Sequence, residues 1–279
     1  MSNGTELEAA LWFILDALRA YAEDVLLIGG WVPYLHLKYG RAAEEGARTS
    51  LTAEADLVVP GRLPPRERPP LVEILEGAGY RRSPSTAAVW EKAPERGERI
   101  EFFQSHLGPA SRRSTIRRVE EQPDLEALSL DHLWILAAFP ELVLVPAPEE
   151  GARPAPARIP LLGAFALNKA NTFSLRGSDD GAVKSAKDVL YLRDIIAAGE
   201  GSVATLEADL ETMLRAPESQ KVRDYVRRGV VHLKNVAPRF HALAGDILSE
   251  RDGMDRAAAR ADVEGYLTDL IDTLEPHEG

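Results

Sequence analysis

The sequence predicts an α+β protein, in which a mixed sheet flanked by helices occupies residues 1–160 and a helical bundle occupies residues 161–279. Two observations support this prediction. Short β-branched runs alternate with helical patterns in the first half, whereas apolar residues after 161 recur almost throughout with helical spacing. Between the halves lies the proline- and alanine-rich stretch 146–160, PAPEEGARPAPARIP, which we interpret as a linker or excursion.

The first elements are a helix, a strand and a second helix. Helical spacing of apolar residues covers 6–23, and Thr5 with Glu8 forms a possible capping box at its start. The segment VLLIGGWVPYLHLKYG at 25–40 predicts a short strand, a tight turn at Gly29-Gly30 and a helix.

More strands follow in the first half. We expect strands over 52–59, 88–92 and 99–105, with the last two antiparallel and joined by the turn PERGE. A helix opens at Pro69-Pro70, and residues 124–145 mix a helix with a short strand. Six helices complete the chain, over 163–173, 183–198, 204–216, 220–236, 240–250 and 257–274.

Composition narrows the functional classes. The net charge of -11 argues against wholesale non-specific nucleic-acid binding, which depends on cations that neutralise phosphates. Two basic patches stand out: residues 219–239 have six Lys or Arg against one Asp, and residues 110–118 have four arginines and no acid. Each patch is either a site for an anionic partner or a solvated surface.

Compartment and metal chemistry follow from what the chain lacks. The sequence has no cysteine, so a bound metal would need oxygen or imidazole ligands. No apolar run reaches the length that spans a bilayer, and the chain begins with polar residues. We therefore expect a cytoplasmic protein without a membrane partner.

The chemistry is predicted from acidic residues on strands. Glu54 and Asp56 are two residues apart, so a strand projects both from one face, and Glu101 is a lone carboxylate in another apolar strand. Carboxylates on neighbouring strands repel unless a hard divalent cation such as Mg²⁺, or Mn²⁺, neutralises them. The alternative is a solvated strand face, because an acidic pair with this spacing is common.

The glycine pair adds context to these carboxylates. Glycines between a strand and a helix allow backbone N–H groups to approach a phosphate, and the helix dipole favours an anion there. Paired glycines also occur in plain turns, so Gly29 and Gly30 gain meaning from the acidic strand that follows them.

Four segments together resemble the nucleotidyltransferase superfamily, with its DNA polymerase beta-like fold, and within it the AbiEii/AbiGii toxin-type branch. They are LIGGWVPYLHLKYG, LTAEADLVV, RIEFF and ALNKANTFSLRGSDDGAVKSAKDVLYL, and the resemblance spans about residues 25–195. It implies a minimal nucleotidyltransferase domain at 1–160 and a helical domain at 161–279 that completes the nucleotide cleft.

The resemblance also implies roles for single residues. Gly29 and Gly30 would form the phosphate-side turn, Glu54 and Asp56 would be metal ligands, and Glu101 would be a third metal ligand or the base for the attacking hydroxyl. Lys169 would meet the triphosphate, with Asp188 orienting Lys169 or the nucleotide. Lys187, with Arg176 and Lys184, would join this phosphate site or be an exposed helical cation.

Function follows from the same resemblance. It implies an enzyme that moves a nucleoside monophosphate from an NTP to a hydroxyl acceptor, either an RNA 3′ end such as that of tRNA or a protein. It further implies a toxin of a toxin-antitoxin or phage-defence system, with a cognate antitoxin as partner. However, glutamates at positions 54 and 101 replace the family's commoner aspartates. The alternative is therefore a catalytically degenerate protein that binds a nucleotide or a partner without chemistry.

Overall fold

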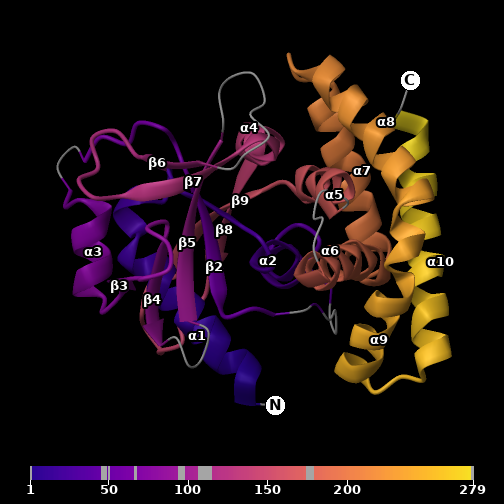
Figure 1. The fold of residues 1–279 in the computed structure, drawn as a ribbon, viewed down its shortest axis with the longest axis horizontal. Helices are drawn as coiled ribbons and strands as arrows, with labels where there is room; N and C mark the ends of the chain where they lie inside the picture. Colours follow the sequence, from indigo (N-terminus) through magenta and orange to yellow (C-terminus); the bar gives the residue numbers. More distant parts are fainter. Residues whose placement is uncertain are drawn as a thin grey trace. The chain divides into compact units, whose positions relative to one another are not determined.

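The computed structural model describes residues 2–44, 49, 51–65, 68–93, 98–105, 115–173 and 179–277 (Figure 1). The chain divides into two compact units. The first comprises residues 1–35 and 51–160, and the second comprises residues 36–50 and 161–279. The predicted α+β class, with a mixed sheet flanked by helices and a C-terminal helical region, is confirmed.

The first unit is built on a mixed sheet. Its described strands form a seven-stranded sheet in which β1-β2-β5-β4-β3 are successive neighbours, while β7 pairs with β5 and β6 pairs with β7. The strand bounds are β1 Leu26–Ile28, β2 Glu54–Val59, β3 Arg81–Arg82, β4 Val89–Ala93, β5 Glu98–Ser105, β6 Thr115–Arg118 and β7 Glu126–Leu130. Strand β5 runs parallel to β2 and β7 but antiparallel to β4.

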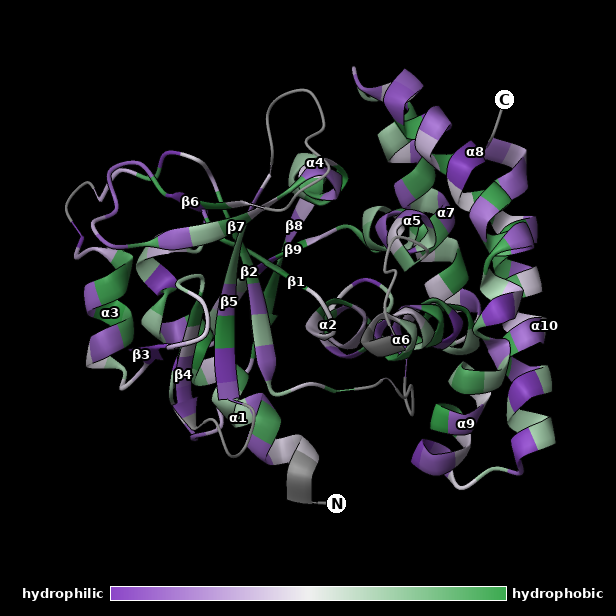
Figure 2. Cartoon of the chain, viewed as in Figure 1, coloured by the Kyte–Doolittle hydropathy of each residue, from purple (hydrophilic) through white to green (hydrophobic). Residues whose placement is uncertain are grey.

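Alternation along the strands decides which face of this sheet is buried. In β2 and β5 the side chains of Ala55, Leu57, Ile100 and Phe102 are buried, and their neighbours on the other face are half-buried and mostly polar. Hydrophilic and hydrophobic residues accordingly alternate along both strands in Figure 2. Because one face provides the core, the other is left for polar side chains.

The first unit has helices where they were predicted, although the first one spans Ser2–Ala17 rather than residues 6–23. They are α1 Ser2–Ala17, the 3-10 turn η1 Arg19–Tyr21, the start of α2 Trp31–Tyr39, α3 Leu71–Gly77, η3 Asp131–Leu133 and α4 Trp134–Ala138. The predicted capping box is wrong, because α1 begins at Ser2 and so places Thr5 and Glu8 inside the helix. Pro70 precedes the first residue of α3, as predicted.

A second correction concerns the proline-rich stretch 146–160. Its last six residues form strand β9, Ala155–Pro160, which pairs antiparallel with β8, Pro140–Val145. In the described residues these two strands form a sheet of their own, and β9 packs against β1 and α1. Prolines are tolerated here because a two-stranded ladder leaves N–H positions outside the pairing.

The described helices of the second unit are the six that were predicted, after the C-terminal part of α2. They are α5 Leu162–Thr172, α6 Asp179–Ala197, α7 Glu200–Leu214, α8 Ser219–Asn235, α9 His241–Asp252 and α10 Arg256–Leu274, with short 3-10 turns η5 Ala237–Arg239 and η6 Glu275–His277. Helix α5 packs against α6, α7 and α8 and is almost wholly buried. No described helix is long and apolar enough to cross a membrane.

Two contacts explain why residues 36–50 group with these helices. Arg41 Nη2 lies 2.5 Å from Oδ1 of Asp209 on α7, and Glu44 Oε1 accepts a 2.9 Å hydrogen bond from the backbone N–H of Gly201. Asp209 is buried, and its other oxygen accepts from the Gly163 N–H at 3.0 Å. The segment after α2 is thereby tied to the start of α5 and to α7.

Candidate functional site

The half-buried face of β2 and β5 brings two of the predicted carboxylates together. Asp56 and Glu101 are register partners on these parallel strands, and Glu54 is two register positions earlier, opposite Arg99. Register partners in neighbouring strands project from the same face of a sheet. The structure therefore places Glu54, Asp56, Arg99 and Glu101 on one surface, with the apolar core behind them.

The glycine turn lies directly against Asp56. Strand β1 ends at Ile28, the register partner of Asp56, and α2 begins at Trp31 after the two glycines. Gly29 has a φ of 77°, and a Cβ built on it would lie 2.2 Å from Asp56 Oδ2. Only glycine fits at this position, because both the left-handed backbone and the carboxylate exclude a side chain.

Glu54 has a partner that the sequence interpretation missed. Its Oε1 lies 2.9 Å from Arg99 Nη2, with side-chain exposures of 41% for Glu54 and 35% for Arg99. The signal was present in the sequence, since Arg99 precedes Glu101 by two residues and so shares its face. One of the three predicted metal ligands is thus engaged with a cation.

The residues can be compared with what a divalent ion requires. Mg²⁺ and Mn²⁺ bind carboxylate oxygens, and Asp56 and Glu101 offer such donors side by side. Within the described residues, however, no group of three or more Asp, Glu or His side chains is close enough to hold a metal. Asp56 and Glu101 therefore stay predicted ligands for a divalent ion, and the three-ligand site with Glu54 also stays a prediction.

The second unit holds the other predicted pair. Lys169 on α5 donates from Nζ to Asp188 Oδ1 on α6 at 2.7 Å. Asp188 is buried, and the Lys169 side chain is 12% exposed. The Lys169 ammonium also lies 5.5 Å from the ring centroids of Phe165 and Tyr191, a distance typical of cation–π contacts. The position of Lys169 is therefore fixed from three sides.

The remaining predicted cations differ from this pair. Lys184 and Lys187 are exposed on α6, whereas Ser185 and Asp188 of the same helix are buried. Arg176 lies outside the described residues. The structure thus presents Lys187 at a surface of the second unit and Lys169 inside it.

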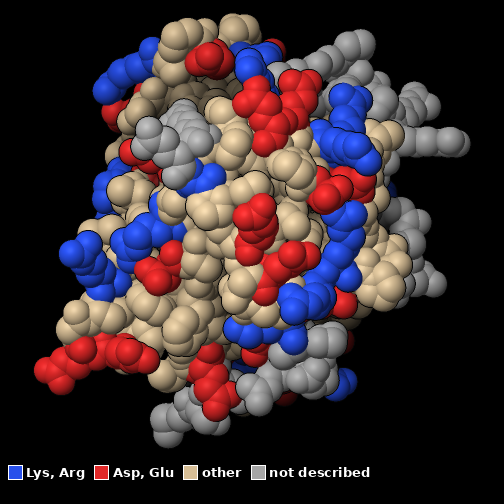
Figure 3. Space-filling model, turned by 90° about the vertical axis from the view of Figure 1, so that its left-hand side faces the viewer, with Lys and Arg blue, Asp and Glu red and all other residues tan. Residues whose placement is uncertain are grey.

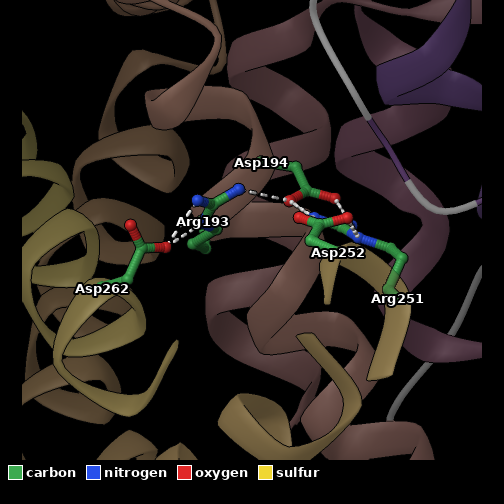
Figure 4. Close-up of polar contacts among 5 residues, drawn as sticks. All are labelled: Arg193, Asp194, Arg251, Asp252 and Asp262. Atoms are coloured by element: carbon green, nitrogen blue, oxygen red, sulfur yellow. Dashed lines mark hydrogen bonds and ion pairs between the residues drawn. The ribbon is translucent and has the colours of Figure 1, made fainter. Parts of the chain in front are cut away.

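A buried ion network joins α6, α9 and α10, and the sequence did not predict it (Figure 4). Asp194 accepts from Arg251 at 2.6 and 3.0 Å and from Arg193 at 3.1 Å, and the exposed fraction of Asp194 is 1%. Arg193 also bonds Asp262, and Arg251 also bonds Asp252. Burial alone would lower the pKa of Arg251, but the hydrogen bonds that it donates to Asp194 and Asp252 raise this pKa above its usual value.

The basic patches of the sequence are surface features. In α8 the side chains of Lys221, Arg227, Arg228 and Lys234 are exposed, and Asp224 lies 3.4 Å from Arg227 among them. In β6 both Arg117 and Arg118 are exposed, whereas 110–114 lie outside the described residues. Figure 3, which looks toward the α3 side of the first unit, shows cations in a band interspersed with acidic residues. The α8 patch therefore includes an acidic residue, and the described part of the second patch is the exposed Arg117-Arg118 pair.

Comparison with known proteins gives one match. A family model described as nucleotidyltransferase matches residues 11–216, a range that includes the Gly29-Gly30 turn, the acidic strands, Lys169 and Asp188. No curated protein and no solved structure matches the chain.

Proposed function

This chain belongs to the nucleotidyltransferase family, and from that premise we propose that it transfers a nucleoside monophosphate from an NTP to a hydroxyl acceptor with release of pyrophosphate. The pairing of Asp56 with Glu101 beside Gly29 is the observation that supports this proposal. It combines carboxylates, which suit a divalent ion, with a glycine turn between a strand and a helix, which suits a phosphate.

Each residue on this face would have a separate role in the reaction. Asp56 and Glu101 would hold a divalent ion, which supplies charge neutralisation at the phosphates when it is bound. The two glycines, of which Gly29 is half-buried and Gly30 is buried, carry no side chain that would keep the phosphates away from the end of β1. The acceptor oxygen would form a bond to the α-phosphorus as the bond to the β-phosphate bridging oxygen breaks, and pyrophosphate would leave with that electron pair. Glu101 would take the acceptor's proton.

Lys169 enters the proposal through the resemblance. A lysine ammonium is a compact point charge that suits a triphosphate, and Asp188 would keep it oriented. The buried ion pair with Asp188 supports a fixed lysine, although the same contact also suits a structural role. Loss of NTP binding in a Lys169→Met protein that still folds would favour the first role.

The decisive experiment is a transfer assay with an internal control. The purified chain is incubated with each α-labelled NTP, Mg²⁺ or Mn²⁺, and either total RNA or a protein extract, beside Asp56→Asn. We expect label to appear in one acceptor class and to fall by at least about 100-fold in Asp56→Asn, since the carboxylate charge is needed in the transition state. Labelling that Asp56→Asn leaves unchanged would contradict the proposal.

A binding module without chemistry is the second candidate, and the Arg99–Glu54 ion pair favours it. A carboxylate held by arginine is one ligand fewer for a metal, as expected for a degenerate site. This candidate predicts Asp56-dependent NTP binding with no label transferred to any acceptor. The transfer assay and a binding titration on the same preparation separate the two functions.

The toxin-type resemblance supplies the biological setting of the proposal. We propose that the acceptor is an RNA 3′ end or a protein, and that the cell restrains the enzyme with a cognate antitoxin. Growth arrest on expression in a bacterial host, abolished by Asp56→Asn, is the expected outcome. Normal growth with full transfer activity in the extract would remove the toxin role and leave the enzymatic one.

A further inference from the structure

The Arg99–Glu54 pair is the feature that the proposed chemistry leaves unexplained. We propose that Arg99 is a resident counter-cation of this site: it holds Glu54 while no metal is bound, and binds an NTP phosphate oxygen when Glu54 turns to a divalent ion. The inference rests on the proposed function and deepens it, because it assigns Arg99 a substrate-binding role and couples metal binding to nucleotide binding.

Arg99 lies close enough to the predicted metal ligands to reach a nucleotide bound there. Arg99 lies on the same strand and face as Glu101, two residues before it, which is a rise of about 6.6 Å along a strand. An extended arginine side chain spans a comparable length. The guanidinium can therefore reach the space beside the Asp56 and Glu101 carboxylates, on the same face of the sheet, without any change in the backbone of β5.

The ion pair between Arg99 and Glu54 is weak enough for Glu54 to change partners. Both side chains of the pair are more than a third exposed, and ion pairs with such exposure are weak and screened by salt. A divalent ion carries twice the charge of the guanidinium and binds carboxylate oxygens directly. Glu54 can thus change partners at small cost, whereas a buried pair such as Lys169–Asp188 could not.

The Arg99 guanidinium also has a hydrogen-bond donor that Glu54 does not use. Within the described residues, the Nε–H of Arg99 is buried and has no hydrogen-bond acceptor, so the bond to Glu54 uses only part of the donor fork. Arginine binds phosphate oxygens best through two parallel N–H groups. Because Nε is buried while Arg99 holds Glu54, the side chain would turn as it leaves Glu54, and a phosphate that then engaged Nε and Nη2 together would satisfy the donor that Glu54 leaves unpaired.

A purely structural ion pair makes a different prediction, and this separates the two explanations. If Arg99 only braced β2 against β5, its loss would weaken every ligand or none. If Arg99 competes with metal for Glu54 and then binds phosphate, its loss must tighten metal binding and weaken NTP binding. Opposite changes in the two affinities are therefore the signature of the proposed role.

The test is a pair of titrations on Arg99→Gln. Mn²⁺ alone is titrated by electron paramagnetic resonance, and an α,β-methylene NTP analogue is then titrated by calorimetry at saturating Mn²⁺. We expect Mn²⁺ to bind about two- to five-fold tighter, the range of a weak exposed ion pair. The analogue should bind about 10-fold weaker, because a charge-assisted hydrogen bond to phosphate is lost.

Two further variants keep the result interpretable. Arg118→Gln removes one positive charge from the same sheet, at a side chain that is 81% exposed and 4.0 Å from Glu126, and should change neither affinity. Arg99→Lys keeps the charge but loses the planar fork, so it should bind Mn²⁺ like the wild type and the analogue with intermediate affinity. Circular dichroism and thermal melting of each variant show that the fold is kept.

The outcomes distinguish this inference from the proposed function. If the wild type binds Mn²⁺ through Asp56 and transfers label, but Arg99→Gln leaves both affinities unchanged or lowers both, the role of Arg99 is wrong and the function stands. If the wild type neither binds Mn²⁺ nor transfers label, the proposed function fails and the inference falls with it.

Discussion

The carboxylate of Asp56 lies against the α-carbon of Gly29, where a Cβ would come within 2.2 Å of Oδ2. This contact joins the end of β1 to the acidic face of β2, so the glycine turn and the carboxylate form one structural unit. Any side chain at position 29 must displace Asp56 or move the turn. The glycine is therefore required by the carboxylate as well as by its own backbone conformation.

Gly29→Ala tests this relationship directly. The left-handed φ of 77° and the clash with Asp56 Oδ2 should together lower the free energy of unfolding by about 1–3 kcal/mol. Because Asp56 must move, Mn²⁺ and NTP binding should weaken as well. Urea unfolding measures the first effect and calorimetric titration measures the second.

Gly77→Ala is the matched control for this substitution. Gly77 ends α3 in the same unit, and a Cβ built there would have nothing within 4 Å. Alanine is favoured over glycine in a helix, so this variant should be unchanged or stabilised by up to about 1 kcal/mol. Equal effects of the two substitutions would show that Gly29 and Asp56 are not coupled.

The Lys169–Asp188 pair predicts a larger loss of stability. Asp188→Asn keeps the shape of the side chain but leaves the Lys169 ammonium without its counter-charge in a site where the lysine is 12% exposed. Breaking such a buried pair costs about 3–5 kcal/mol. Urea unfolding should show a loss in this range, compared with less than about 1 kcal/mol for Asp224→Asn, whose partner Arg227 is exposed.

A double variant separates structure from function at this pair. Lys169→Met with Asp188→Leu replaces both charges by apolar groups and should recover part of the stability, because no unpaired charge remains. NTP affinity should stay low in the double variant if Lys169 meets the triphosphate. Recovery of both stability and NTP affinity would show that the pair is structural only.

Much of the fold follows from local patterns. The strand, Gly29-Gly30 turn and helix were predictable because the glycines interrupt an apolar run, and β2 because its residues alternate and end at Pro60. The sequence predicted that the two acidic strands are neighbours, but not the register that sets Asp56 beside Glu101. The pairing itself depends on tertiary structure that a single sequence does not specify.

The features that the sequence did not predict depend on contacts between segments that are distant in the chain. Strand β9 contains Pro156 and Pro160, so its composition favours a linker, and only pairing with β8 makes it a strand. Charged residues of helices, such as Asp194 and Arg251, look like solvated surface until the packing of α6 against α9 buries them. The ion pair of Arg99 with Glu54 likewise depends on the register of β2 and β5, which a single sequence does not specify.

Tyr80 predicts how stability depends on alkaline pH. Burial, with a smaller contribution from the charge of Glu98, raises the pKa of Tyr80 from 10.0 to about 12. The unfolded state therefore loses its phenol proton first, so the stabilising effect is complete below pH 10 and is lost as pH rises toward 12. Between pH 9 and 12, urea unfolding of the wild type should show the free energy of unfolding fall by about 1–2 kcal/mol through this effect. Tyr80→Phe has no phenol proton at this position, so its profile should lack this loss. Parallel profiles for the two proteins would contradict the raised pKa.

The Asp194 network in Figure 4 predicts the greatest sensitivity in the second unit. Asp194→Asn removes the charge that Arg193 and Arg251 share, while Arg251 keeps Asp252 as a counter-charge. Because Asp194 is 1% exposed, we expect the free energy of unfolding to fall by about 3–5 kcal/mol.

The second unit offers a matched comparison for this network. Asp246 on α9 bonds Arg260 on α10 at 3.0 Å, with side-chain exposures of 33% and 47%. Asp246→Asn should therefore cost less than about 1 kcal/mol, since water already screens that pair. Thermal and urea unfolding of both variants measure the difference. Similar small losses would mean that solvent reaches Asp194, and that packing of α6 against α9, rather than the ion network, stabilises this unit.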